Sequence, residues 1–313
     1  MKRKSFLRNS ALILGAGLLP ELADAGTGTG EKKPIRFAHI TDIHLKPGAI
    51  PEAGMAAVLH HLQSLKTPVD FIINGGDSIM DSLEADKAKT STQWELFTGL
   101  LAKENSLPIY HTIGNHDIWG WFIKKDRPEE DPLYGKHWVI EKLAMSNRYY
   151  SFTKGRWTII VLDSTQLNPA GGYIGKLDDE QLAWFQNTLA AVPPDQYICL
   201  VSHIPILAVC SGLFFDKTEA NGDLLVKRNL MHTDFLQLRK LFRKYPNLKA
   251  CISGHIHLQD EVHYLDISYF CNGAVSGNWW GGAFQEFDPA YAVIELHDDG
   301  RCTRTMHTYG ESK

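Results

Sequence analysis

The sequence predicts an α/β fold, in which strands and helices alternate along the chain. Short apolar runs have the length and composition of buried strands, and stretches of helical periodicity separate them. The strand-like runs are residues 35–40, 69–74, 109–113, 158–162, 197–202 and 248–253. Because ligands of open α/β sheets bind at the carboxyl ends of the strands, the residues that follow these runs are the first candidates for a functional site.

Four helices are predicted from apolar residues that recur every three or four positions. We interpret all four apolar faces as packing surfaces. In chain order the faces are Met55, Val58, Leu59, Leu62 and Leu65; Trp94, Phe97 and Leu101; Leu182, Phe185 and Leu189; and Phe235, Leu238, Leu241, Phe242 and Tyr245.

Length and composition favour one large domain over residues 26–313. The chain has 313 residues, of which 44% are hydrophobic, and this is enough for a sizeable core. The formal net charge is −4 and the sequence pI is about 6.4. Because nucleic-acid binding requires a strongly positive surface, we expect no nucleic-acid polymer as a partner.

The first 25 residues are predicted to be a signal peptide. Positions 2–4 are basic, positions 11–19 are apolar, and positions 23–25 form an Ala-Asp-Ala cleavage site. Residues 3–7 resemble a twin-arginine signal with Lys in place of the second Arg, so both the Tat and the Sec routes stay open. The apolar run is shorter than the roughly 20 residues of a spanning helix, which disfavours an uncleaved anchor. We expect an exported protein, periplasmic or extracellular, with no integral membrane segment in the mature chain.

The cysteines are predicted to have no catalytic role. Five is an odd number for an exported protein, so at least one thiol is expected to stay free or to pair between chains. None has a second cysteine at CxxC spacing, and two of them lie in apolar strand-like runs, as small core residues do. They are Cys199, Cys210, Cys251, Cys271 and Cys302.

Side chains that can bind metal ions follow the predicted strands in short clusters. Carboxylate, amide and imidazole donors together suit first-row divalent metals better than calcium or a thiolate zinc site. The candidate ligands are Asp42, His44, Asp77, Asn115, His203, His255 and His257. Only the strand-like run 158–162 ends without such a donor cluster, in Asp163-Ser164.

The order of these clusters resembles that of the calcineurin-like binuclear metallophosphoesterases. The family pattern runs DxH, GD, GNH(D/E), a later His and GHxH, and every ligand position is filled between residues 37 and 260. The resemblance implies a four-layer αββα sandwich: two mixed β-sheets flanked by helices, with the metal site at the C-terminal strand edges. Residues 269–276 and 292–297 are then expected to be late strands of the second sheet.

The resemblance also implies two ligand sets that share one carboxylate. Asp77 is expected to bridge two metals, since two nearby cations repel unless an anion lies between them. Asp42, His44 and His257 are implied as the other ligands of one metal, and Asn115, His203 and His255 as those of the second. The donor set accommodates iron, manganese, zinc or cobalt. A hydroxide bridging the metals is expected to attack the phosphorus of a phosphate ester.

His116 and Asp117 are the candidate catalytic residues within the GNHD motif. By resemblance, His116 contacts the phosphate or protonates the leaving group, and Asp117 orients His116. The alternative is that His116 only fixes the position of Asn115.

Neighbouring residues narrow the expected subfamily. Purple acid phosphatases carry a Tyr three residues after the bridging Asp, where this chain has Met80, and protein Ser/Thr phosphatases carry an Arg soon after GD, which is absent here. The remaining resemblance is to cyclic-nucleotide phosphodiesterases and glycerophosphodiesterases. We expect hydrolysis of a small-molecule phosphodiester. The alternatives are a phosphomonoesterase, a nucleotide or lipid pyrophosphate hydrolase, and a non-catalytic metal- or phosphate-binding surface protein.

Aromatic residues in two segments are candidates for the substrate-binding rim. The segment after GNHD carries several, and residues 277–282 contain a Trp pair flanked by glycines. Both segments suit stacking against a flat group and also suit capping of the sheet edges. Residues 171–175 form a further glycine-rich loop, to which the sequence assigns no chemistry. The aromatic residues of the first segment are Trp119, Trp121, Phe122, Tyr134 and Trp138.

Overall fold

The structure is a computed structural model that describes residues 33–309 apart from residues 126 and 217. Everything below concerns the unit formed by residues 32–313. The predicted signal peptide, residues 1–25, lies outside the described residues. Within the described residues, no helix is both long and apolar enough to cross a membrane.

The first of the two large sheets has five strands in the order β13–β12–β1–β2–β3. The strand β1 pairs in parallel with β2 and antiparallel with β12, so the sheet is mixed. The strand bounds are β1 Ile35–Ile40, β2 Phe71–Asn74, β3 Ile109–His111, β12 Ala290–Leu296 and β13 Cys302–Thr308.

The second large sheet has six strands in the order β10–β11–β9–β8–β5–β4. Its central strands run parallel and its two edge strands run antiparallel to their neighbours. The bounds are β4 Tyr150–Lys154, β5 Trp157–Leu162, β8 Tyr197–Ser202, β9 Leu248–Ser253, β10 Gln259–Tyr264 and β11 Ile267–Asn272. A separate hairpin consists of β6 Thr165–Leu167 and β7 Tyr173–Gly175.

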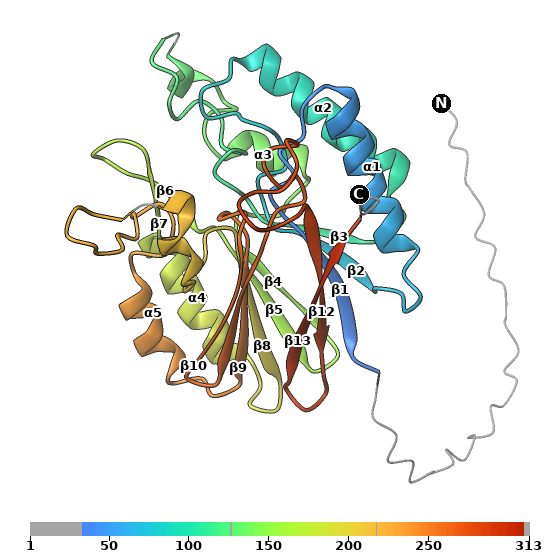
Figure 1. Ribbon diagram of the computed structural model, residues 1–313. Helices are drawn as coiled ribbons and strands as arrows, with labels where there is room; N and C mark the ends of the chain where they lie inside the picture. The colour runs from blue at the N-terminus through green and yellow to red at the C-terminus, as the bar shows by residue number, and fades with distance from the viewer. Residues whose placement is uncertain (1–32, 126, 217, 310–313) are drawn as a thin grey trace, which may run out of the picture. The chain divides into compact units, whose positions relative to one another are not determined.

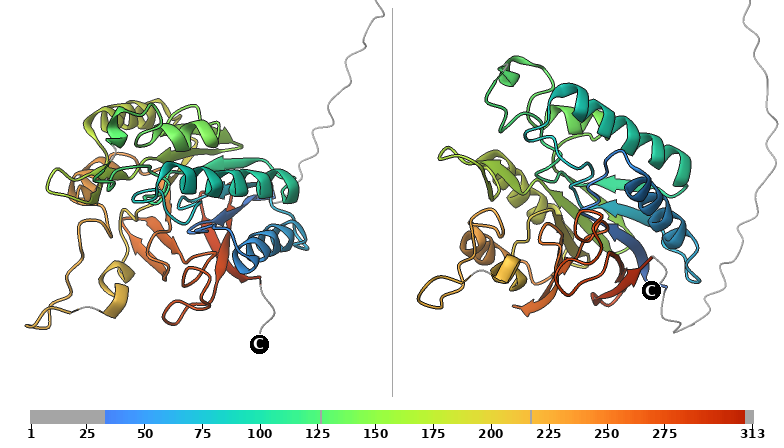
Figure 2. Two further views of the ribbon diagram at one scale, coloured as in Figure 1. Left: turned by 90° about the horizontal axis from the view of Figure 1, so that it is seen from above. Right: turned by 45° about the horizontal axis from the view of Figure 1, so that its top comes forward.

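Helices cover the outer faces of the two sheets and complete four layers (Figures 1 and 2). Apolar residues of α1, α2 and α3 pack on the five-stranded sheet, and those of α4 and α5 pack on the six-stranded sheet. The helix bounds are α1 Ala49–Gln63, α2 Lys87–Glu104, α3 His137–Lys142, α4 Asp179–Ala191 and α5 Phe235–Phe242. Short 3-10 turns occupy Pro128–Glu130, Cys210–Gly212 and Phe214–Asp216.

Two of the helices begin at aspartate caps. The side chain of Asp86 accepts a hydrogen bond from the backbone N–H of Lys89, and Asp178 accepts one from the N–H of Gln181. Each cap satisfies a backbone donor that has no partner within its helix. The caps define where α2 and α4 start after the loops that leave the sheets.

The middle layer joins the inner faces of the two sheets. Side chains alternate along each strand, so Phe37 points into this layer whereas Ala38 faces the helices. The rings of Phe37 and Phe71 stack with centroids 5.1 Å apart, and Trp157 of the other sheet belongs to the same buried cluster. The layer therefore holds both sheets, and the ligand-bearing ends of their strands, in a fixed relative position.

The predicted α/β class, the two mixed sheets and the four helices are confirmed. The placement of residues 292–297 in the second sheet is wrong, because β12 pairs antiparallel with β1 in the five-stranded sheet. After β11 the chain crosses to the free edge of β1, where Ala292 and Ile294 join the middle layer. Residues 269–276 are a strand only as far as Asn272.

Replacing Phe71 by Ala is expected to destabilise the protein by roughly 3 to 5 kcal/mol, because the change leaves a cavity between the two sheets. Phe71 is 1% exposed and contacts the rings of Phe37, Tyr110 and Phe152. Urea unfolding of the mature protein measures the loss. The control is Leu236→Ala on α5, which is 62% exposed and should change the stability by no more than about 0.5 kcal/mol. Equal effects of the two variants would contradict the central role of this layer.

Candidate metal centre

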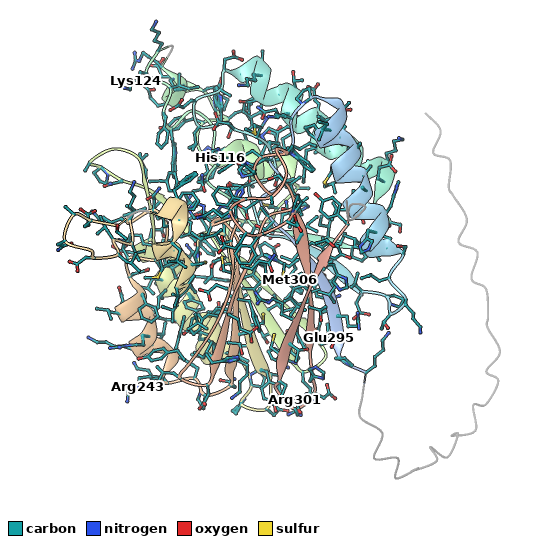
Figure 3. All side chains as sticks on the ribbon, viewed as in Figure 1. His116, Lys124, Arg243, Glu295, Arg301 and Met306 are labelled. Carbon is teal, nitrogen blue, oxygen red and sulfur yellow. The ribbon has the colours of Figure 1, made fainter. Side chains whose placement is uncertain are left out.

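All seven candidate ligands follow the carboxyl ends of strands and meet at one edge of the two sheets. Asp42 and His44 follow β1, Asp77 follows β2 and Asn115 follows β3. From the other sheet, His203 follows β8, and His255 and His257 follow β9. Figure 3 marks this edge by His116, while Arg243 and Arg301 lie at the opposite end of the strands.

The first group of donors consists of Asp42, His44 and His257. Their ligand atoms lie within 4.8 Å of one another, as required of side chains that bind the same ion. Nε2 of His44 lies 3.1 Å from Nε2 of His257, which lies 3.5 Å from Oδ1 of Asp42. These three side chains can therefore hold one metal ion.

The second group consists of Asp77, Asn115, His203 and His255. Nε2 of His203 is at its centre, 3.2 Å from Oδ2 of Asp77, 3.1 Å from Oδ1 of Asn115 and 3.2 Å from Nδ1 of His255. The donors thus converge on one point, as in the first group.

Asp77 lies between the two groups. Its Oδ2 is 3.2 Å from Nε2 of His203 and 3.7 Å from Nε2 of His44. Its Oδ1 accepts a 2.7 Å hydrogen bond from the backbone N–H of His116. One carboxylate oxygen therefore faces both groups, which is the arrangement expected of a bridging ligand.

Backbone carbonyls orient three of the four imidazoles. Nδ1 of His203 bonds to the carbonyl of Gly75, Nδ1 of His257 to that of Gly277, and Nε2 of His255 to that of Asn229. Such a bond fixes which nitrogen carries the proton and leaves the other nitrogen free to bind a metal. His44 is the exception, since its Nδ1 has no hydrogen-bond partner.

The two buried carboxylates stay ionised because of their surroundings. Burial by itself raises the pKa of Asp42 and of Asp77, but the neighbouring histidines outweigh it and lower both. Burial lowers the pKa of His44 to about 3 and that of His255 to about 4, so these imidazoles are neutral. Anionic carboxylates and neutral imidazoles are the protonation states that bind metals.

His203 differs from the other imidazoles. Burial lowers its pKa, but the Asp77 carboxylate more than compensates and raises it to about 9. At neutral pH the proton on His203 balances the charge of Asp77. A cation bound at Nε2 must displace this proton.

Five of the seven candidate ligands have a left-handed backbone. The φ angles are 53° at Asp42, 47° at His44, 51° at Asp77, 73° at His255 and 62° at His257. Such conformations cost residues other than glycine on the order of 1 to 3 kcal/mol each, and they concentrate at functional sites. The fold therefore tolerates local strain to aim these donors inward.

Two glycines of the motifs are required by close contacts. A Cβ atom on Gly254 would lie 2.3 Å from Oδ2 of Asp42, and one on Gly114 would lie 2.2 Å from Oδ1 of Asp77. The backbones of the GHxH and GNHD motifs thus pass directly against the two carboxylates.

His116 lies at the rim of the centre. Its side chain is 31% exposed, whereas each of the seven candidate ligands is at most 8% exposed. Its ring lies edge-on to that of His44, with centroids 5.0 Å apart, and its Nδ1 is 3.2 Å from Oδ1 of Asp81. His116 is therefore the residue of the motif that a substrate can reach from solvent.

The expected contact between Asp117 and His116 is wrong, because both oxygens of Asp117 bind backbone N–H groups. Oδ1 accepts a 2.8 Å hydrogen bond from Ser78, and Oδ2 accepts a 2.9 Å bond from Gly114. Asp117 joins the loops that carry Asp77 and Asn115, and Asp81 is the acid that orients His116. The only sequence signal for Asp81 as the acid that orients His116 is its position four residues after Asp77.

Asp163, at the strand end without a metal-binding cluster, is part of an ion-pair network. Its carboxylate binds the ammonium group of Lys136 and the guanidinium group of Arg148, and it is fully buried. Ser164 accepts a hydrogen bond from the backbone of Ile204, next to His203. This strand end supports the centre and contributes no ligand.

The two Trp residues of segment 277–282 have different surroundings. Trp279 packs against His257 with ring centroids 4.4 Å apart, so it lies beside the first group of donors. Trp280 donates a hydrogen bond from Nε1 to the carbonyl of His44 and packs on Gly54 of α1. Trp279 thus borders the centre, while Trp280 is a structural support.

The donor atoms meet the requirements of a metal centre. Oδ1 of Asp42 is a buried carboxylate oxygen without a hydrogen-bond partner, and it faces Nε2 of His257. A buried anionic oxygen without a partner is costly unless a cation binds it. The oxygen and imidazole chemistry suits first-row metals.

A family model supports the same interpretation. The model of the calcineurin-like phosphoesterases matches residues 35–259. The chain belongs to the calcineurin-like phosphoesterase family. Members of this family are metal-dependent hydrolases, so the two donor groups are the candidate metal sites of such an enzyme.

Curated relatives match over most of their length. A 3',5'-cyclic-nucleotide phosphodiesterase from Nostoc sp. is 26% identical over 287 residues, which cover 87% of this chain and 92% of that protein. The 3',5'-cyclic adenosine monophosphate phosphodiesterase CpdA from Escherichia coli is 23% identical over 290 residues, which cover 89% and 91%.

The fold is also shared with a solved structure. A dimetal phosphatase from Danio rerio superposes with a TM-score of 0.60 at 13% sequence identity, over 88% of this chain and 100% of that chain. At this identity the likeness concerns the fold alone.

Replacing Gly254 by Ala is expected to weaken metal binding roughly 10- to 100-fold, because the new methyl group displaces Asp42 and the Thr41 hydroxyl that bonds to it. Metal titration followed by elemental analysis measures the loss. The control is Gly99→Ala in α2, where an added Cβ meets nothing within 4 Å. Unchanged metal affinity in the Gly254 variant would show that the close approach of this backbone to Asp42 does not matter for binding.

Proposed function

We propose that this phosphoesterase hydrolyses a small-molecule phosphodiester of the cyclic-nucleotide or glycerophosphodiester type. The observation that carries the proposal is the convergence of the other six donors around Asp77, with His116 exposed beside them. The cyclic-nucleotide phosphodiesterases among the relatives support the choice of a diester.

The proposed ligand sets are those implied by the motifs. Asp42, His44 and His257 would hold one metal, Asn115, His203 and His255 would hold the other, and Asp77 would be shared. Bound metals would supply Lewis acidity and would lower the pKa of water at the centre. The identity of the metals is to be found by elemental analysis of protein expressed in its own compartment.

His116 and Asp81 can position the substrate and transfer a proton. His116, held by Asp81, faces solvent next to His44 and can donate a hydrogen bond to a phosphoryl oxygen or a proton to the leaving oxygen. Because the ligands are buried and three of their four imidazoles are oriented by backbone carbonyls, little reorganisation is needed when charge develops on the phosphoryl group.

The proposed location is outside the cytoplasm, after removal of residues 1–25. The support is the sequence pattern of a basic start, an apolar stretch and a cleavage site. Cell fractionation and N-terminal sequencing test the proposal, with a mature N-terminus expected near Gly26. Recovery of the intact chain from the cytoplasm would contradict it.

A substrate panel tests the reaction class. Mature protein is incubated with cyclic AMP, glycerophosphoethanolamine, nitrophenyl mono- and diesters and a nucleoside diphosphate ester, each with and without a chelator. We expect turnover of diesters that chelation abolishes and added metal restores. Preference for the monoester or the diphosphate ester would favour the alternative hydrolases. Binding of phosphate without turnover of any ester would indicate a non-catalytic protein.

Asp77→Ala is expected to abolish both metal binding and turnover, because this carboxylate faces both donor groups. His116→Ala is expected to keep the metals while kcat falls roughly 10²- to 10⁴-fold. Metal analysis and initial rates on the same preparations distinguish the two effects.

The matched control is His263→Ala on β10, whose side chain is 67% exposed and pairs with Glu261. This change should leave both measurements unaltered. Loss of metal in the His116 variant would instead make His116 a ligand, as its position near His44 and Asp77 allows.

A further inference from the structure

A cavity of about 520 Å³ lies next to the second group of donors. Its walls come from three segments distant in sequence: the loop after GNHD, the β6–β7 hairpin and the segment before α5. The residues that carry the argument are Phe122, Tyr173, Leu225, Val226, Arg228 and Asn229. The glycine-rich loop 171–175, to which the sequence assigned no chemistry, thus forms part of this wall.

Two of the lining residues touch a candidate metal ligand. The carbonyl of Asn229 accepts a 2.8 Å hydrogen bond from Nε2 of His255. The ring of Tyr173 lies edge-on to the ring of His255, with centroids 6.2 Å apart. His255 therefore links the cavity wall, through its Nε2, to the second group of donors, through its Nδ1.

The walls of the cavity are suited to a flat ring. The rings of Phe122 and Tyr173 are nearly parallel, at 13° with centroids 6.3 Å apart, and both are partly exposed. Leu225 and Val226 line the same cavity and add apolar surface, being 56% and 37% exposed. Aromatic faces and apolar side chains bind planar heterocycles by stacking, and the volume is that of a typical small-ligand site.

Polar groups at the cavity can fix the orientation of such a ring. The Tyr173 hydroxyl and the side chain of Asn229 hydrogen-bond to each other, so a polar pair borders the aromatic wall. Lys227 and Arg228 are exposed residues of the cavity lining, and their charges make its entrance positive. A positive entrance attracts a negatively charged ester.

We propose that this cavity binds the nucleobase of a nucleotide diester, with Tyr173 and Phe122 as the specificity-determining residues. The inference rests on the proposed phosphodiesterase function and deepens it. Of the two diester types considered above, the cavity selects the cyclic nucleotide over the glycerophosphodiester. The base stacks on the aromatic wall while the phosphate lies at the metal centre.

The experiment compares a substrate with a base and one without. Steady-state kcat and KM are measured for cyclic AMP and for glycerophosphoethanolamine with wild-type metal-loaded protein, Tyr173→Ala and Phe122→Ala. Tyr173→Phe keeps the ring, and Tyr264→Ala on β10 is a matched substitution outside the cavity. Melting temperatures and metal content are recorded for every variant.

We expect KM for cyclic AMP to rise roughly 10-fold in each alanine variant, because each removes one aromatic ring on which the base stacks. The kcat for cyclic AMP and both constants for glycerophosphoethanolamine should change less than about twofold. Tyr173→Phe, which keeps the ring, should raise KM for cyclic AMP less than Tyr173→Ala does, and Tyr264→Ala, outside the cavity, should resemble the wild type. An equal loss on both substrates, or no change on either, would overturn the proposal.

A binding measurement separates this inference from the proposed function. Adenosine 5'-monophosphate and ribose 5-phosphate are titrated into metal-loaded wild-type and Phe122→Ala protein by calorimetry. Tighter binding of the adenine compound to wild type, reduced in the variant, supports the cavity even if neither diester is hydrolysed. Equal affinity for the two compounds rejects the base site, whatever the activity. If an acyl glycerophosphodiester is bound instead and competes at the same residues, the cavity is a site for an apolar chain and the base assignment fails.

Discussion

The structure depends on the neutralisation of two buried carboxylates, Asp42 and Asp77. A buried carboxylate is strongly unfavourable unless hydrogen bonds and opposite charges surround it. Here the backbone N–H of His255 and the hydroxyl of Thr41 bond to Asp42, while the N–H of His116 and the ring of His203 serve Asp77. Because these groups come from both sheets, the electrostatic requirement of the centre also determines how the sheets meet.

The rest of the fold supplies the rigidity that this arrangement requires. Five candidate ligands adopt an unfavourable left-handed backbone conformation at one edge of the molecule. The three buried layers on and between the sheets offset that cost, since each ligand is only a few residues beyond the end of a strand whose side chains are mostly buried. A surface loop without such support would relax to ordinary backbone angles and turn its donors toward solvent.

Much of the centre could be predicted from the sequence because its donors lie in short motifs directly after strands. The identity of β12 as the neighbour of β1 could not, since strand pairing depends on contacts between residues hundreds of positions apart. The sequence also could not show that Asp81, and not Asp117, contacts His116. Which of the two acids lies beside His116 depends on how two loops pack, and neither motif spacing nor composition predicts that packing. Tyr173 could not be recognised as a site residue because its proximity to His255 arises only from the folding of the β6–β7 hairpin over the sheet edge.

The link between the two ends of the domain has a consequence for biosynthesis. Ser276 donates its hydroxyl to the carbonyl of Asp42, 234 positions earlier, and Trp280 bonds to the carbonyl of His44. The strand that carries these first ligands also needs β12 along its edge. A ribosome-bound chain lacking its last segments therefore has no finished centre, and the domain folds only when nearly all of it is available, as expected for a topology rich in long-range contacts. The candidate metal centre is therefore expected to assemble only after the last strands of the domain have been synthesised.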